Sequence, residues 1–148
     1  MALRNIVTEP DELLHKKCRK VEIFDENLGI LIDDMFETMK NAKGVGLAAP
    51  QIGILKRIVV VNVGDGNIEL VNPEIIEQDG EQREDEGCLS CPGKYGITIR
   101  PNFVRVKAQN RLGEFFEYSG YSLKARAFCH EIDHLDGILF TSHLVELK

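Results

Sequence analysis

The chain has 148 residues, enough for one domain with a buried core that needs no disulfide staples. Apolar residues make up 43% and charged residues 28% of it, which is the composition of an ordinary globular protein. The formal net charge of −6 favours solubility, and no basic block is present that would follow a phosphate backbone. We therefore expect a single domain over residues 1–148 and no nucleic-acid partner.

Nothing in the sequence indicates export or membrane insertion. The start, Met1–Val7, is interrupted by polar residues and does not build the apolar stretch of a secretion signal. The longest β-branched run, Ile58–Val61, is far too short to span a bilayer. We therefore expect a cytoplasmic protein with no membrane partner. In that reducing compartment we interpret the cysteines as core residues, ligands or nucleophiles rather than disulfides; they are Cys18, Cys88, Cys91 and Cys129.

Apolar residues recur at helical spacing between Asp25 and Ala42, which predicts an amphipathic helix. We expect Asp25 to cap its N-terminus and Gly44 to stop its C-terminus. The segment that follows, Gly44–Gly53, holds too many glycine and proline residues for a helix interior.

The middle of the chain is predicted to form strands. Alternation and β-branched residues indicate them over Arg57–Val63, over Ile68–Ile76 with a break near Pro73, and over Phe103–Gln109. Turn residues separate these segments, and Glu114–Tyr118 resembles the return arm of a hairpin.

A second helix, roughly from Ser122 to Leu135, is predicted to close the chain, ended by Asp136 and Gly137. Strands that cluster between two helices, instead of alternating with them, favour an α+β fold over repeated βαβ units. We expect central antiparallel strands packed around the C-terminal helix, with the other long helix near the N-terminus.

The strongest chemical signal lies in this second helix, at His130-Glu131-Ile132-Asp133-His134. Residues four apart lie one turn above each other, so the two imidazoles can share one metal ion. Glu131 projects beside them, within reach of a water molecule rather than of the metal. The alternative is a solvated helix that carries two histidines and an acid by chance.

A catalytic site of this kind needs a third protein ligand and one open position. The extended HExxH protease pattern requires a third histidine where this chain has Phe140, so that pattern fails. His143 has no motif to support it, and we interpret it as a surface residue. Cys88 offers a thiolate, which is a good partner for imidazoles on zinc or ferrous iron.

A rival interpretation adds Cys91 to Cys88 and both histidines, which would close a structural zinc site with no position for water. The gap from Cys91 to His130 is much longer than in finger-type sites. A redox Cys-x-x-Cys motif is less favoured, because no βαβ unit precedes it.

Three segments resemble the three motifs of the peptide deformylase family; they are Gly44–Gly53, Glu86–Ser90 and His130–Gly137. They occur in that family's order and at compatible spacing, and the resemblance covers nearly the whole chain. It implies a hydrolase that removes the formyl group from the N-terminal formylmethionine of newly made bacterial or organellar proteins and releases formate. The expected partners are N-formylmethionyl nascent peptides.

The resemblance also implies a role for individual residues. The metal ligands would be Cys88, His130 and His134. Glu131 would be the catalytic acid–base, and the oxyanion hole would be formed by the Gln51 side chain and the backbone N–H of Leu89. The substrate-binding residues would be Val45, Gly46 and Leu123. The resemblance implies ferrous iron as the native metal, with zinc, nickel or cobalt as substitutes.

Two features depart from the family's pattern. Cys91 stands where the family usually has an aliphatic residue, and we interpret it as a core substitution. Some members carry a long C-terminal helix that contacts the ribosome, whereas only eleven residues follow Gly137 here. We therefore expect transient proximity to the ribosome without that helix.

Two other classes of function stay open on the sequence. An HExxH metallopeptidase would act on unformylated peptides, so the choice of substrate separates it from a deformylase. A non-catalytic structural-zinc module would hold a metal with no exchangeable water.

Overall fold

A computed structural model describes residues 2–147 of the chain. Its helices are α1 (Glu26–Asn41) and α2 (Ser122–Leu135), with short 3-10 turns at η1 (Glu12–His15), η2 (Ala49–Ile52) and η3 (Phe140–His143). Its strands are β1 (Gly46–Ala48), β2 (Ile58–Val61), β3 (Ile68–Asp79), β4 (Gln82–Gly87), β5 (Tyr95–Arg100), β6 (Phe103–Gln109), β7 (Phe115–Tyr121) and β8 (Leu144–Leu147).

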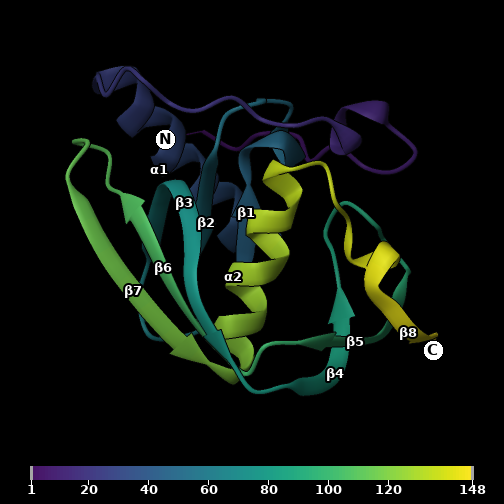
Figure 1. The fold of residues 1–148 in the computed structure, drawn as a ribbon. Coiled ribbons are helices and arrows are strands. Elements are labelled where there is room, and N and C mark those ends of the chain that lie inside the picture. The colour runs from purple at the N-terminus through teal and green to yellow at the C-terminus, as the bar shows by residue number, and fades with distance from the viewer. Residues whose placement is uncertain (1, 148) are drawn as a thin grey trace.

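The strands form two antiparallel sheets with α2 between them. The larger sheet has the order β1-β2-β3-β6-β7, and the smaller has the order β4-β5-β8. Figure 1 shows α2 running along the large sheet, with the small sheet on its other side. The predicted α+β architecture is therefore confirmed. The expectation that α2 closes the chain was wrong, because η3 and β8 follow it and β8 pairs with β5.

The ends of α1 follow from its sequence. Asp25 caps the N-terminus as predicted, since its side chain accepts a hydrogen bond from the N–H of Leu28. At the other end Lys43, not Gly44, adopts the left-handed conformation, with φ of 59°. The N–H of Lys43 bonds to the carbonyl of Lys40 and that of Gly44 to Met39, which is a Schellman ending.

The long β-branched run, Ile58–Val61, forms strand β2. Ile58 and Val60 pack in one apolar cluster with α1, while Val59 and Val61 pack in another with α2. A strand covered by a helix on each face has no solvated side, so its sequence is apolar throughout instead of alternating. The large sheet is thus the rigid support against which α2 is held.

The break expected near Pro73 is present as a shift of register between β3 and β6, while β3 itself continues to Asp79. Asn72 stands at the shift with φ of 52°. Its side-chain oxygen accepts from the N–H of Val21 and its amide donates to the Val21 carbonyl, which holds this conformation in place.

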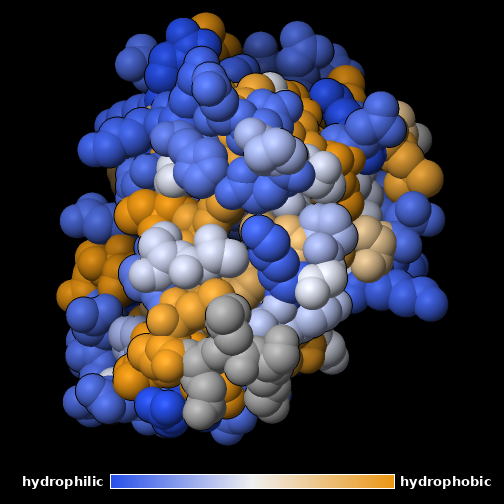
Figure 2. Space-filling model, turned by 90° about the vertical axis from the view of Figure 1, so that its right-hand side faces the viewer, coloured by the Kyte–Doolittle hydropathy of each residue, from blue (hydrophilic) through white to orange (hydrophobic). Residues whose placement is uncertain are grey.

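The strands of the small sheet were not predicted. The residues of β4 and β5 that face inward are mainly polar, namely Glu86, Thr98 and Arg100, whereas Ile99 is 41% exposed. This is the reverse of the alternation by which a half-buried strand is recognised. Figure 2 faces this side of the molecule and shows hydrophobic surface interspersed among hydrophilic residues.

Within residues 2–147, no helix combines the length and the apolar character that crossing a membrane would require.

Candidate active site

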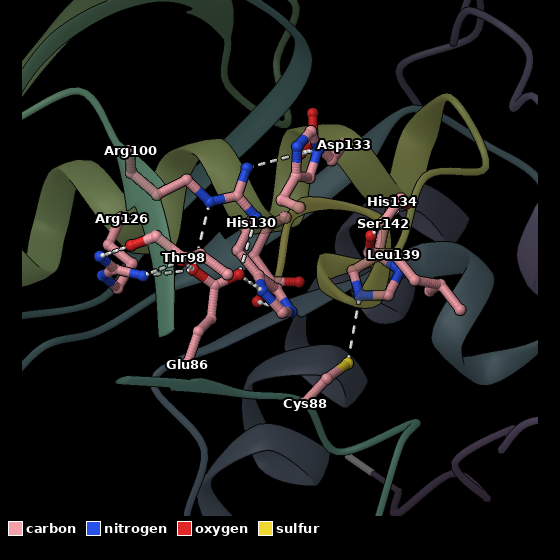
Figure 3. A network of polar contacts seen from close by, with 12 residues as sticks. Glu86, Cys88, Thr98, Arg100, Arg126, His130, Asp133, His134, Leu139 and Ser142 are labelled. Carbon is pink, nitrogen blue, oxygen red and sulfur yellow. Dashed lines mark hydrogen bonds and ion pairs between the residues drawn. The ribbon is translucent and has the colours of Figure 1, made fainter. Parts of the chain in front are cut away.

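Two histidines of α2 and one cysteine of the β4–β5 loop converge beneath the small sheet. Donor atoms of Cys88, His130 and His134 all lie within 4.8 Å of one another. The two imidazoles stand one helical turn apart, with ring centroids separated by 5.0 Å. The Cys88 sulfur is 3.3 Å from His134 Nε2. Figure 3 marks this contact with a dashed line. Cys91 is not a member of this group of residues.

These donors suit a divalent transition metal. One thiolate and two imidazoles, drawn together in a site of low exposure, form a ligand set typical of zinc or ferrous iron. Burial lowers the pKa of His134 to about 3, so its ring is neutral and its lone pair is available at cellular pH. The Nδ1 of His130 lies 2.6 Å from Glu86 Oε2. This contact orients the ring and leaves Nε2 available for a metal ion.

Glu131 lies beside this group without belonging to it. Its carboxylate is buried, Oε2 is 4.0 Å from His130 Nε2, and Oε1 has no hydrogen-bond partner among the described residues. Burial raises the pKa of Glu131 to about 7, although the charge of His130 acts in the opposite direction. A buried carboxyl group that titrates near neutrality and keeps an unused oxygen is suited to proton transfer.

A buried ionic network contacts His130 through Glu86, at the Nδ1 side of its ring (Figure 3). Glu86 accepts hydrogen bonds from the Oγ1 of Thr98 at 2.8 Å, from Arg100 Nη2 at 2.7 Å and from Arg126 Nη1 at 2.6 Å. Burial opposes its ionisation, but the hydrogen bonds from His130 and Arg100 outweigh this and hold the pKa of Glu86 well below its usual range.

The network continues along α2. The Nη1 of Arg100 donates to Asp133 Oδ2 at 2.7 Å, and His143 Nε2 lies 3.2 Å from the same oxygen. His143 has a side chain that is 41% exposed, as expected for a surface residue. Arg100 thereby connects strand β5 to α2 at two positions, directly at Asp133 and through Glu86 at His130.

A pocket of about 300 Å³ opens onto the group. All the predicted site residues except His134 line it; they are Val45, Gly46, Gln51, Cys88, Leu89, Leu123, His130 and Glu131. Residues from β1, η2, the β4–β5 loop and α2 thus surround one cavity, and His134 completes the group through its contact with Cys88.

Gln51 is buried in the wall of this pocket. Its Oε1 accepts a hydrogen bond from the N–H of Ala48 at 2.9 Å, which fixes the orientation of the amide. Its Nε2 donates to Ser90 Oγ at 3.1 Å and approaches the Cys88 sulfur at 3.6 Å. The amide donor is therefore directed toward Cys88, one of the three clustered donor residues.

A family model described as polypeptide deformylase matches residues 3–148. The chain belongs to the peptide deformylase family. It is therefore an enzyme, a hydrolase that removes formyl groups from peptides, and its family is metal-dependent. The metallopeptidase alternative receives no support from these comparisons.

Similar peptide deformylases cover almost all of the chain. That of Acetivibrio thermocellus is 57% identical over 98% of this chain and 85% of its own length. Peptide deformylase 1 of Bacillus subtilis is 53% identical over 97% of this chain and 91% of its own.

Solved peptide deformylase structures share the fold. The structure from Legionella pneumophila has a TM-score of 0.94 at 49% identity, and covers 97% of this chain and 86% of that one. The structure from Thermotoga maritima has a TM-score of 0.94 at 41% identity, and covers 97% of this chain and 99% of that one.

The residues of the ionic network were missed by the sequence analysis. Glu86 lies inside one of the deformylase motifs and Asp133 inside another, so the motifs pointed to them without giving them a role. Arg100 and Arg126 belong to no motif. The signal that could have found them is the presence of charged residues at inward positions of β5 and α2.

Glu86→Gln is expected to lower metal affinity or turnover roughly 10- to 100-fold, the range seen when a partner of a metal-binding histidine is lost. The amide keeps the shape but removes the charge that orients His130 and balances two arginines. Competition with a chelator and formate release would measure the two effects. Exposed Glu84 on the same strand provides the matched control as Glu84→Gln, and equal losses in the two variants would contradict the role of Glu86.

Proposed function

We propose that the chain deformylates N-formylmethionyl nascent peptides at a metal held by Cys88, His130 and His134. The observation that carries this proposal is the convergence of three donor atoms within 4.8 Å, beside the buried and partly unpartnered carboxylate of Glu131. Three protein ligands leave a position open for water, as a hydrolytic site requires.

We propose ferrous iron as the native metal, with zinc, nickel or cobalt as substitutes. Two imidazoles and a thiolate suit all of these ions, and the choice of iron rests on the resemblance to the family. A bound ion supplies Lewis acidity, which polarises water and the formyl oxygen at neutral pH.

Glu131 serves as the acid–base residue in this proposal. Its carboxylate takes a proton from the attacking water and returns it to the amine that leaves when the formyl C–N bond breaks, so the products are formate and a free N-terminus. A pKa near 7 permits both steps close to cellular pH, because the group can gain or lose the proton there at little cost.

Gln51 and the backbone N–H of Leu89 are the proposed oxyanion donors. The contact from Gln51 Nε2 to the Cys88 sulfur is long, at 3.6 Å, so this hydrogen is only weakly engaged and is available to a substrate oxygen while the bond to Ser90 is kept. Donors that are fixed before the reaction stabilise the developing negative charge without reorganising.

Val45, Gly46 and Leu123 are the proposed substrate-binding residues. A Cβ atom added to Gly46 would lie 2.6 Å from Glu131 Oε2, so only glycine lets the β1 backbone run this close to the acid–base group. Val45 is 40% and Leu123 49% exposed on the pocket wall, where a peptide backbone and an apolar side chain can contact them.

We also propose that residues 1–148 act as one catalytic domain in the cytoplasm, near the ribosome only transiently. The proposed ligands come from both α2 and the β4–β5 loop, so the site requires the large and the small sheet together.

Anaerobic purification, metal analysis and a formate-release assay test the proposal together. We expect one metal ion per chain and formate release from a formyl-Met peptide, with no cleavage of the same peptide without the formyl group. A metal that is present while neither peptide is turned over would instead support a structural site.

Gln51→Leu is expected to lower kcat by roughly 10²- to 10³-fold while metal content stays normal, because one oxyanion donor is lost. Since the substitution also removes the acceptor for Ala48 N–H, Gln51→Glu is the companion variant: it keeps an oxygen for that bond but lacks the amide donor. A raised KM with unchanged kcat in both variants would make Gln51 a substrate-binding residue instead.

A further inference from the structure

The β4–β5 loop carries a second thiol, Cys91, three residues after the proposed metal ligand Cys88. Cys88 and Cys91 begin and end a turn in which the N–H of Cys91 donates to the carbonyl of Cys88 at 3.0 Å. A four-residue turn closed by this bond brings its end residues within the separation that a disulfide spans.

The two sulfur atoms differ in their access to solvent. Cys88 lines the pocket, whereas Cys91 is only 2% exposed and packs with Leu14, Leu139 and Phe140. A small oxidant that enters the pocket therefore reaches Cys88 first. A metal ion held by the proposed ligands would keep Cys88 as the thiolate, which is the reactive form.

We propose that Cys91 is a resolving cysteine, which converts peroxide damage at Cys88 into a reversible Cys88–Cys91 disulfide. The inference rests on the proposed role of Cys88 as a metal ligand. A disulfide sulfur is neutral and no longer offers a thiolate, so formation of the bond releases the metal and stops turnover until the bond is reduced.

The chemistry balances with a hydroperoxide as oxidant. The Cys88 sulfur attacks the peroxide, the O–O bond breaks, and for hydrogen peroxide the products are a sulfenic acid and one water. The Cys91 thiol then attacks the Cys88 sulfur, the S–O bond breaks, and a second water leaves. Two thiols lose two electrons and two protons, and a dithiol reductant restores them by exchange.

Without a neighbouring thiol, the sulfenic acid would take up more peroxide and pass to the irreversible sulfinic acid. The remaining cysteines cannot replace Cys91. Cys18 and Cys129 lie in the apolar cluster between α2 and the large sheet, and burial raises the pKa of each thiol to about 11. They provide internal controls that should stay reduced.

The test uses the full chain loaded with zinc, which takes no part in the redox chemistry itself. It is treated with increasing hydrogen peroxide under nitrogen and digested with trypsin, which leaves both cysteines in the peptide of residues 84–94. We expect this peptide to lose the mass of two hydrogen atoms in step with zinc release. Dithiothreitol should restore both thiols, zinc binding and formate release.

Cys91→Val and Cys91→Ala should retain zinc and activity before oxidation, but should gain oxygen atoms at Cys88 that dithiothreitol does not remove. Cys18→Ala should behave like the unaltered chain. Oxygen addition to Cys88 in the unaltered chain, or equal recovery of the Cys91 variants, would overturn the proposal. Full zinc content in Cys88→Ser before any peroxide would instead overturn the ligand assignment. The peptide mass of the unaltered chain would still report whether the disulfide forms.

Discussion

Glu131→Gln is expected to keep its metal and to lose nearly all turnover. Glutamine has the shape of glutamate but cannot accept and return a proton, and removal of a general base typically costs around 10²- to 10⁴-fold in rate. Metal binding should survive because Glu131 lies outside the group of three donors, with its nearest carboxylate oxygen 4.0 Å from His130 Nε2.

Metal analysis and formate release on the same preparation would check this result. Glu117→Gln makes the same chemical change on an exposed position of β7 and should leave both quantities unchanged. Loss of metal from the Glu131 variant would mean that the carboxylate is a ligand, and the assignment of acid–base chemistry to it would be wrong.

Cys88→Ser is expected to lose most of its metal and, with it, formate release. A serine hydroxyl is neutral at cellular pH and replaces a thiolate, so one of the three proposed ligands would lose its charge and its affinity for the ion. Changing only a partner of a metal ligand costs roughly 10- to 100-fold, so the loss of a ligand should exceed about 10²-fold in affinity.

Cys91→Val provides the contrast. This residue is 2% exposed in an apolar cluster, so a side chain of similar volume should change packing only slightly and leave metal content and activity near normal under nitrogen. Equal metal loss in the two variants would support a four-ligand structural site. Normal activity in Cys88→Ser would remove the third ligand on which the proposed mechanism depends.

The parts of the fold that the sequence predicted are those in which local preference and tertiary packing agree. The boundaries of β6 were predicted to the residue and those of α2 approximately, and the cap at Asp25 was confirmed, because apolar periodicity and capping chemistry are local properties. All the predicted site residues except His134 line one pocket, because the motifs that carry most of them, although far apart in sequence, were each tied to the same chemistry.

The small sheet and its ionic network could not be predicted in the same way. Glu86, Thr98 and Arg100 are polar residues that face inward, and each is satisfied only by partners distant in sequence. Burial of such a charge costs several kcal/mol unless these partners are present, so the segment reads as a solvated loop when it is examined alone. The left-handed residue at the end of α1 was also misplaced by the sequence analysis. This conformation usually selects glycine, so Gly44 was expected there, whereas Lys43 adopts it.

Cys88 lies in the loop between β4 and β5, opposite two histidines of α2. This position predicts that metal binding affects the local stability of the β4–β5 hairpin as well as catalysis. A metal ion held by the proposed ligands would tie the β4–β5 hairpin to α2, and an ion that binds only this docked arrangement would stabilise it by mass action. Amide hydrogen exchange should therefore slow in β4 and β5 when the chain is loaded, while β2, covered by a helix on both faces, should change little. Loss of the ion would then show itself first as a local opening of this hairpin, well before the large sheet unfolds.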